Sequence, residues 1–346
     1  MASDALETLA ALSELPGISG QEGAVRAYLR ERAAARADEL RTDALGNLFA
    51  VKGAGKPGPR ILLAAHMDEI GLIVTSVDDD GFVRFRKVGG IDDRVLLAKA
   101  VHVGQKRVPG VIGSKPIHLQ SPGERTKVVP ADEMYIDIGA KDKAEAQRLV
   151  EPGDAVTFAT SFGEFGEGMV KGKAFDDRAG CTVLLEALAG EYDAPVYGVF
   201  TVQEEIGLRG ARVAAYAVEP DVALVLEGTP AADIPLEEGE TSSTVLGRGP
   251  ALSFMDGSSI ADRELVQTII RVAEREGIPW QWRRTQGGGN DAGAIHLSKA
   301  GVRTASISVP CRYIHTPCAV LHKEDLRNTI RLVQAVVAEL ASQRRA

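Results

Sequence analysis

Two adjacent carboxylates stand at the end of an apolar run in the middle of the chain. Glu204 and Glu205 follow residues 199–202 (VFTV), whose β-branched and aromatic side chains predict a buried strand. Gly207 and Gly210 then provide turn signals. Because ligands bind outside the carboxyl ends of strands in open α/β sheets, the two glutamates are predicted to border a site. Neighbouring side chains point in different directions, so one carboxylate could bind a cation while the other transfers a proton. A solvated strand end is the simpler alternative.

Imidazoles and further carboxylates occur at other predicted element ends. His66 and Glu227 directly follow apolar strands, so together with Glu205 they would lie on one rim of the sheet. The other two ligand candidates are Asp176, near the start of a predicted helix, and His315. Two imidazoles and three carboxylates suit a pair of Zn²⁺-like or Co²⁺-like ions with one bridging carboxylate, whereas Ca²⁺ prefers oxygen ligands alone.

Each of these candidates also has a structural explanation. A lone histidine such as His66 is often a structural residue, although Asp68 can accept the other ring N–H and fix the tautomer. Asp176 and Asp177 could simply cap a helix. Glu227 could be an exposed strand end.

His315 lies between Cys311 and Cys318, which suggests a second kind of site. A small structural zinc site could use these three residues, but structural zinc normally has four ligands and no fourth one is nearby. Cys181 lies in an apolar helical pattern and is expected to be part of the core. This interpretation is therefore the less favoured one.

The elements that must position these residues follow an α/β pattern. Helical spacing predicts a first helix over residues 3–15, and Ser19 with Glu22 resembles a capping box for a second helix ending near Ala37. Further predicted helices are 175–188, 209–218, 262–276 and 323–340, and predicted strands are 39–42, 47–52, 60–65, 199–202, 221–226 and 303–309.

The segment 71–163 has a different pattern of predicted secondary structure. Short alternating strands are predicted at 71–77, 82–88, 100–103, 107–112, 134–138 and 155–158, with one helix at 143–150. They indicate a small β-barrel or sandwich. The expected fold is α/β, with a mixed-sheet domain formed by residues 1–70 and 164–346 and a β-barrel domain inserted at 71–163.

Charge and composition exclude several partners. The formal net charge is −8 and the 40 basic residues are scattered, which gives no electrostatic case for nucleic acid or an anionic membrane. The N-terminal segment is acidic and no apolar stretch is long enough to span a bilayer, so the cytoplasm is the expected location. Three cysteines form no disulfide framework, in agreement with a reducing compartment.

Five short motifs follow one another in a specific order along the chain. They are residues 65–71 (AHMDEIG), 174–178 (AFDDR), 204–207 (EEIG), 227–229 (EGT) and 315–317 (HTP). In this order the chain resembles the tetrahedral metallo-aminopeptidases, a family of glutamyl and leucyl aminopeptidases once labelled cellulase M or endoglucanase. The resemblance covers almost the whole chain and includes residues 111–118 (VIGSKPIH), 247–250 (GRGP) and 289–292 (GNDA).

The resemblance implies two divalent metal ions, Zn²⁺ or Co²⁺, per subunit. Asp176 would bridge them. Glu205 and His315 would complete one site, and His66 and Glu227 the other. Many members of the family carry aspartate where this chain has Glu227.

Three further roles follow from the same resemblance. Glu204 would be the general base on a water that bridges the ions, and Asp68 would be the partner of His66. Asp177 would follow Asp176 through a cis peptide bond.

The implied function is an aminopeptidase that removes N-terminal residues from short peptides with a free N-terminus. The implied assembly is a homo-oligomer in which dimers, joined through the inserted domain, form a hollow tetrahedral dodecamer. A two-metal N-acyl amino acid deacylase or carboxypeptidase would use the same residues, and a metal-stabilised peptide-binding protein is the non-enzymatic alternative. A metal-free glycosidase needs two carboxylates that flank a sugar, which the adjacent Glu204 and Glu205 do not provide.

The sequence leaves the N-terminal residue preference and the native metal open. Glu237, Glu238 and Glu240 would favour basic N-terminal residues if their loop lined the pocket, but a solvated loop is the simpler interpretation. The glycine-rich segment 286–289 matches no phosphate-binding motif and is expected to be a loop with close backbone approach.

Overall fold

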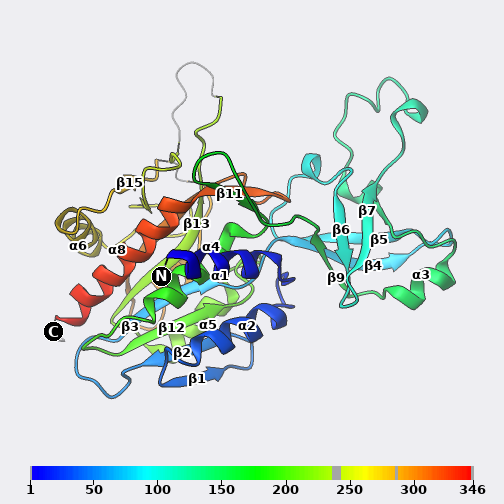
Figure 1. Cartoon of the computed structure of the whole chain (residues 1–346). Coiled ribbons are helices and arrows are strands. Elements are labelled where there is room, and N and C mark those ends of the chain that lie inside the picture. The colour runs from blue at the N-terminus through cyan, green and yellow to red at the C-terminus, as the bar shows by residue number, and fades with distance from the viewer. Residues whose placement is uncertain (1, 236–242, 285–286, 344–346) are drawn as a thin grey trace.

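A large mixed sheet and a separate closed barrel form the framework of the protein (Figure 1). The computed structural model describes residues 2–235, 243–284 and 287–343. Within these residues the larger sheet has 11 strands and the barrel is closed by β4-β5-β8-β7-β6-β9. The α/β fold with a barrel inserted in the chain, expected from the sequence, is confirmed.

Parallel strands make up the centre of the larger sheet. Its main path is β1-β2-β12-β3-β13-β16-β17-β11-β10, and β3 pairs in parallel with both β12 and β13. Both faces of β3 are buried because helices cover the sheet on each side. The strands are β1 (Glu39–Thr42), β2 (Leu48–Lys52), β3 (Ile61–His66), β10 (Gly163–Phe165), β11 (Met169–Gly172), β12 (Val196–Thr201), β13 (Val222–Pro230), β14 (Ala251–Leu252), β15 (Gln281–Trp282), β16 (Arg303–Arg312) and β17 (Ala319–His322).

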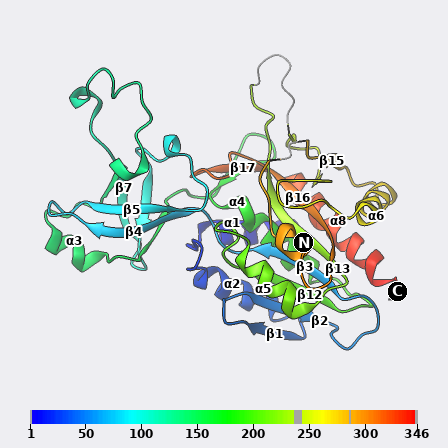
Figure 2. The same cartoon turned by 180° about the vertical axis from the view of Figure 1, so that it is seen from behind.

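The helices of this domain lie on the two faces of the sheet. One core cluster joins strand residues to α1 (Ala2–Glu14), α2 (Gly23–Ala33), α4 (Phe175–Ala187), α6 (Arg263–Arg275) and α8 (Lys323–Ala341). A second cluster joins the opposite face to α5 (Arg209–Val218) and α7 (Ala292–Ile295), and α5 is in front in Figure 2. The sheet is therefore the middle of three layers, which leaves its strand ends free to carry a site.

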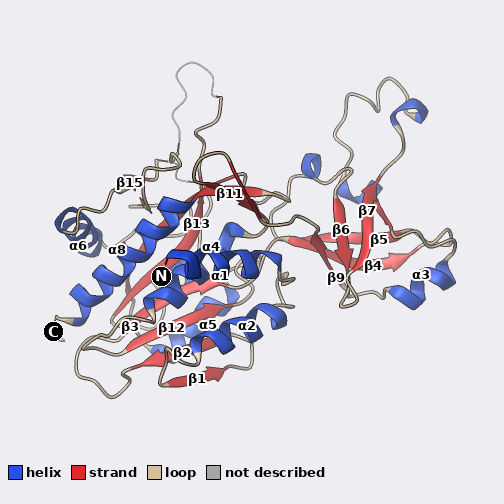
Figure 3. Cartoon of the chain, viewed as in Figure 1, coloured by secondary structure: helices blue, strands red, loops and turns tan. Residues whose placement is uncertain are grey.

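The barrel has a hydrophobic core of its own, formed by residues such as Leu72, Val83 and Ile136. It lies to one side of the larger sheet (Figure 3). Every strand predicted in this segment is present to within one residue. The strands are β4 (Gly71–Val77), β5 (Val83–Val88), β6 (Ala100–Val103), β7 (Val108–Gly113), β8 (Tyr135–Asp137) and β9 (Ala155–Phe158), and the helix is α3 (Lys143–Leu149).

The predicted capping box at the second helix is wrong. The Ser19 hydroxyl donates to Asp68 Oδ2 at 2.6 Å and does not cap α2. The helix begins at Gly23 after Glu22, whose carboxylate accepts hydrogen bonds from the backbone N–H groups of Gly20 and Gln203. The helix also ends at Ala33, earlier than predicted. The side chains of Ser19 and Glu22, which the local pattern assigned to the start of the helix, thus make hydrogen bonds to residues outside it.

The strand that carries Glu227 is longer than predicted. It continues through Glu227 to Pro230 because β16 pairs with it along its whole length, up to Cys311. The sequence also gave no prediction for β10, β11, β14, β15, β17 and α7. These elements have only two to four residues, too few to show a period.

Among the helices that the structure describes, none combines the length and the apolar character that a bilayer span requires.

Candidate metal centre and active site

The candidate site lies at the carboxyl ends of the central parallel strands. His66 is the last residue of β3, and Glu204 and Glu205 stand in the turn after β12. Glu227 lies within β13. Asp176 comes from the first turn of α4, and His315 comes from the connection between β16 and β17. The structure brings these six predicted residues together, from five segments that are distant in the chain.

His66 is the centre of one group of ligand atoms. Its Nε2 is 3.2 Å from Asp176 Oδ1 and 3.1 Å from Glu227 Oε1. Glu204 Oε2 is farther from the same nitrogen, at 3.9 Å. His66, Asp176 and Glu227 therefore form the tightest set, and Glu204 stands beside it.

His315 is the centre of a second group. Its Nε2 is 3.3 Å from Asp176 Oδ2 and 3.7 Å from Glu205 Oε2. Each oxygen of Asp176 thus faces a different imidazole. A carboxylate between two ligand sets is the arrangement that a pair of bridged metal ions requires.

Backbone carbonyl groups orient both imidazoles. His66 Nδ1 is 3.0 Å from the carbonyl oxygen of Asp68, and His315 Nδ1 is 2.9 Å from the carbonyl oxygen of Gly90. With the proton on Nδ1, each ring directs the lone pair of Nε2 at the cluster. The sequence predicted the Asp68 carboxylate as the partner of His66, but this carboxylate is more distant, with Oδ1 at 3.5 Å from Nδ1.

The Asp68 carboxylate mainly binds the backbone of the turn that contains Glu204 and Glu205. Its Oδ1 accepts from the backbone N–H of Glu204 at 3.0 Å, and its Oδ2 accepts from that of Glu205 at 3.1 Å. Ser19 donates a third hydrogen bond. Because Asp68 is fully buried, these bonds fix the direction in which the two glutamates leave the chain.

The peptide bond between Asp176 and Asp177 is cis, as the resemblance implied. Asp177 is also near the cluster, because a carboxylate oxygen of Asp177 lies within 4.8 Å of those of Asp176 and Glu227. Its carboxylate accepts from the backbone N–H of His66 at 3.1 Å and of Gly180 at 2.8 Å. A side chain at position 180 would have its Cβ only 2.3 Å from Asp177 Oδ1, so glycine is required there.

Burial and mutual repulsion dominate the electrostatics of the cluster. Burial and then the repulsion from Glu227 raise the pKa of Glu204 well above its ordinary value, against the attraction of His66. Burial also raises the pKa of Glu205 to about 7, helped by the negative charge of Asp176. The hydrogen bond to Asp176 raises the pKa of His315 to about 9. When the carboxyl groups of the cluster are ionised, their negative charge exceeds the positive charge that the two imidazoles can carry.

The donor set fits divalent metal ions. Glu227 Oε2 is buried and has no hydrogen-bond partner, so one carboxylate lone pair in the cluster is left for a cation. The ligand atoms of His66, Asp176 and Glu205 lie within 4.8 Å of one another, as do those of His66, Glu204 and Glu227. The second group makes Glu204 a competing ligand candidate.

The less favoured alternative, a structural zinc site of Cys311, His315 and Cys318, finds no support among the described residues. In the described residues, none of the groups that could hold a metal contains a cysteine. Cys311 is buried in β16, and the ring of His315 contacts Asp176.

A pocket of about 480 Å³ opens next to the cluster. Its lining includes Asp176, Glu204, Glu227 and His315 from the cluster. The remaining wall is formed by Gly228, Thr229, Pro230, Arg283, residues 287–289, Asn290, Ser308 and Ile314. Part of the predicted glycine-rich loop therefore lines the pocket, whereas Gln286 lies outside the described residues. No motif in the sequence marked Arg283.

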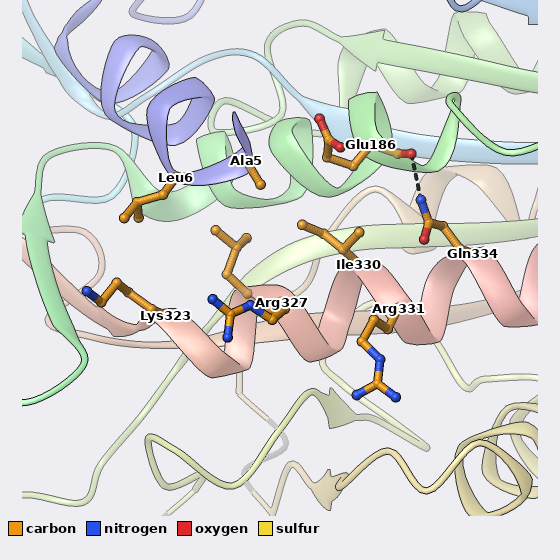
Figure 4. Close-up of a pocket in the computed structure, with 9 residues that line it drawn as sticks. Ala5, Leu6, Glu186, Lys323, Arg327, Ile330, Arg331 and Gln334 are labelled. Carbon is orange, nitrogen blue, oxygen red and sulfur yellow. Dashed lines mark hydrogen bonds between the residues drawn. The ribbon is translucent and has the colours of Figure 1, made fainter. Parts of the chain in front are cut away.

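A second cavity, of about 380 Å³, lies between α1, α4 and α8 (Figure 4). Leu6 and Ile330 line it, and Gln334 Nε2 donates to the backbone oxygen of Glu186 at 2.9 Å. The Glu186 carboxylate pairs with Arg36 at 2.8 Å. None of the predicted site residues lines this cavity.

Comparison with known proteins gives one consistent result. The model of the family described as M42 glutamyl aminopeptidase matches residues 46–332. The solved TET aminopeptidase of a marine sediment thaumarchaeote is 40% identical with a TM-score of 0.95, and the match covers 99% of this chain and 98% of that one. A TET peptidase of Pyrococcus horikoshii, which can assemble into a tetrahedron or a large octahedral shell, is 36% identical with a TM-score of 0.85 over 97% and 99% of the two chains. The lysyl aminopeptidase of Pyrococcus furiosus is 34% identical, over 96% of this chain and 97% of its own length.

Proposed function

This chain belongs to the M42 glutamyl aminopeptidase family, and we propose that it removes single residues from the N-termini of peptides with the help of two divalent metal ions. The observation that carries the proposal is the placement of Asp176, with one carboxylate oxygen toward each of two imidazoles. A peptidase function follows from the family. The geometry is the basis on which we assign metal binding and proton transfer to individual residues.

We assign five residues to the two ions. Asp176 would be shared, His66 and Glu227 would hold one ion, and His315 and Glu205 the other. When bound, Zn²⁺ or Co²⁺ would supply Lewis acidity toward water and toward the carbonyl group of the first peptide bond. Glu227 has one methylene more than aspartate, and its Oε1 still reaches to 3.1 Å from His66 Nε2.

Glu204 is the residue that we assign to proton transfer. Its side chain is 11% exposed and borders the pocket, so it can meet both an attacking water and a leaving amine. Because burial raises the pKa of this carboxyl well above its ordinary value, Glu204 is a stronger base than a solvated glutamate. It would take a proton from the water and later deliver it to the amine that leaves.

The acidic shell around His66 suits a free amino terminus. A substrate α-ammonium group would be attracted by Glu227 and its neighbours, whereas an acylated amine would carry no charge. This difference favours an aminopeptidase over an N-acyl amino acid deacylase or a carboxypeptidase.

Metal-reconstituted protein tests the proposal directly. We expect it to hydrolyse unblocked aminoacyl-p-nitroanilides, and to leave N-acetylated analogues and C-terminal residues intact. Chelation should abolish turnover while circular dichroism shows a folded protein. Hydrolysis of only the N-acetylated substrates would instead support the deacylase, and unfolding on chelation without any turnover would support the metal-stabilised binding protein.

We also propose that the chain assembles into dimers and then into a tetrahedral dodecamer. The support is the assembly named for the Pyrococcus horikoshii relative, together with five exposed apolar residues on the barrel segment, Val111, Ile117, Leu119, Val128 and Leu149. Exposed apolar surface is common at protein–protein interfaces. Light scattering at physiological salt would test the assembly, and a monomeric mass would contradict it.

A further inference from the structure

We infer that Glu22 is a positioning residue for the proposed general base: its carboxylate holds residues 202–205, the Glu204 turn, in the conformation that directs the Glu204 side chain toward the cluster. The inference rests on the proposed function, since it names a residue that acts through the proposed base. It starts from Ser19 and Glu22, which the sequence pattern assigned to the start of a helix and which make their hydrogen bonds elsewhere.

Side chains accept hydrogen bonds from all four backbone N–H groups of the Glu204 turn. These groups lie beyond the strand ladder, because β12 ends at Thr201. Asn47 Oδ1 accepts from the first of them at 3.0 Å, and Glu22 Oε1 accepts from the second at 3.2 Å. The two oxygens of Asp68 accept from the third and the fourth, at 3.0 Å and 3.1 Å. Three segments that are distant in the chain therefore fix one turn.

Burial makes these hydrogen bonds costly to lose. Asn47 and Asp68 have no exposed surface, and Glu22 is 3% exposed. A buried N–H group that loses its acceptor keeps the full cost of its desolvation. Hydrogen bonds to a carboxylate are also stronger than those between neutral groups. The three acceptors therefore restrict the turn to one backbone conformation.

Glu22 joins the turn to the loop before α2. Its Oε1 also accepts from the backbone N–H of Gly20 at 2.7 Å, and its own carbonyl oxygen accepts from the N–H of Arg26, in the first turn of the helix, at 2.9 Å. The nearby Ser19 hydroxyl donates to Asp68 Oδ2 at 2.6 Å. The Glu22 carboxylate is thus fixed at its own end, so it can hold the turn instead of following its movements.

The residue that Glu22 holds has an uncommon backbone conformation. Gln203 has φ +56°, in the left-handed region that residues other than glycine rarely adopt. Without its acceptor, Gln203 would be free to return to a common φ, and this rotation would turn the following residue, Glu204, away from its place. Glu204 Oε2 is 3.9 Å from His66 Nε2, too far for a hydrogen bond that could hold the carboxylate instead. The direction of the base therefore depends on the backbone before it.

The first test changes the Glu22 side chain and measures kcat, KM and metal content on the same preparation. Glu22→Met removes the acceptor at nearly the same length. We expect kcat to fall by about 10- to 100-fold, because a misplacement of about 1 Å can cost about 100-fold, while KM and both bound ions are retained. Glu22→Gln keeps a carbonyl oxygen and should recover most of kcat. Glu31→Met, at an exposed position of α2, is the matched control and should behave as wild type.

A second test determines whether Glu22 acts through Glu204. In the Glu204→Gln background the base is already absent, so adding Glu22→Met should lower kcat no further. A loss of the same size in both backgrounds would mean that Glu22 supports the fold in general, and it would overturn the inference. Wild-type kcat in a folded Glu22→Met variant would overturn it as well.

A third readout does not depend on turnover. Hydrogen exchange of the metal-loaded protein, followed by mass spectrometry on a peptide that spans residues 202–208, should be faster in Glu22→Met than in wild type and unchanged in Glu31→Met. Equal exchange in all three proteins would show that Glu22 does not hold the turn. If wild type cleaves no unblocked substrate, the proposed function fails, and this measurement still decides what Glu22 does. If thermal unfolding shows that Glu22→Met does not fold, Glu22→Asp, which keeps the charge but is one methylene shorter, replaces it in every comparison.

Discussion

Replacing Glu204 with Gln is the most direct test of the proposed chemistry. Glutamine keeps the size of the side chain but cannot accept a proton from water. Under the proposed ligand assignment both metal ions should remain bound, because Glu204 Oε2 is 3.9 Å from His66 Nε2 while Glu227 Oε1 is at 3.1 Å. We therefore expect a metal content of two ions per chain together with very low turnover.

The size of the effect follows from the environment of Glu204. General-base catalysis contributes about 10²–10⁴-fold to a rate. Since the Glu204 side chain is only 11% exposed, bulk water is poorly placed to replace it as a base. We expect kcat to fall by about 10³-fold, which corresponds to about 4 kcal/mol in activation free energy.

The assay measures kcat on an unblocked aminoacyl-p-nitroanilide and metal content by plasma mass spectrometry on the same preparation. Glu227→Gln is the informative comparison and should lose one ion. Glu274→Gln, at an exposed position of α6, should leave both quantities unchanged. A Glu204→Gln variant that binds only one ion would make Glu204 a ligand, and one that retains wild-type kcat would remove it from the mechanism.

Three further predictions concern stability and pH. Asp68→Asn replaces one of the two acceptor oxygens by an N–H₂ group, which then faces at least one of the three hydrogen-bond donors, so urea unfolding should show a loss of about 2 kcal/mol, and an unchanged midpoint would contradict this role. In the metal-free protein, burial raises the pKa of Glu205 from 4.5 to about 7, and the hydrogen bond to Asp176 raises that of His315 from 6.5 to about 9. Because both pKa values are raised by folding, the contribution of each group to stability is complete below its unfolded pKa and is lost as pH rises through its folded pKa, about 7 for Glu205 and about 9 for His315. The melting temperature of the metal-free protein should therefore fall between these pH values. The fall should be steeper than that of the metal-loaded protein. Glu69→Gln removes the buried partner at 2.7 Å from Lys173 Nζ and leaves the buried cation unpaired, so denaturant unfolding should show a loss of roughly 3–5 kcal/mol, and a loss near zero would refute the buried pair.

The secondary structure was largely accessible from the sequence because its periods are local. The alternation in residues 71–77 and the apolar run before His66 are visible within a few residues, and both segments are strands. Short elements such as β14 and α7 escaped because neighbouring strands and helices, and not a local period, stabilise them. Glu227 was placed after its strand because the pairing with β16, which extends β13, is a long-range property.

For the site, the sequence by itself determined which kinds of side chain stand at the strand ends and in which order. Only the tertiary structure decided that Asp176 faces both imidazoles, that Asp68 holds the Glu204 turn, and that Arg283 enters the pocket. The chemical type of each side chain and the periodicity of a strand or helix can be read from a few neighbouring residues. The approach of groups more than a hundred residues apart depends on how the whole core packs, and no local pattern contains that information.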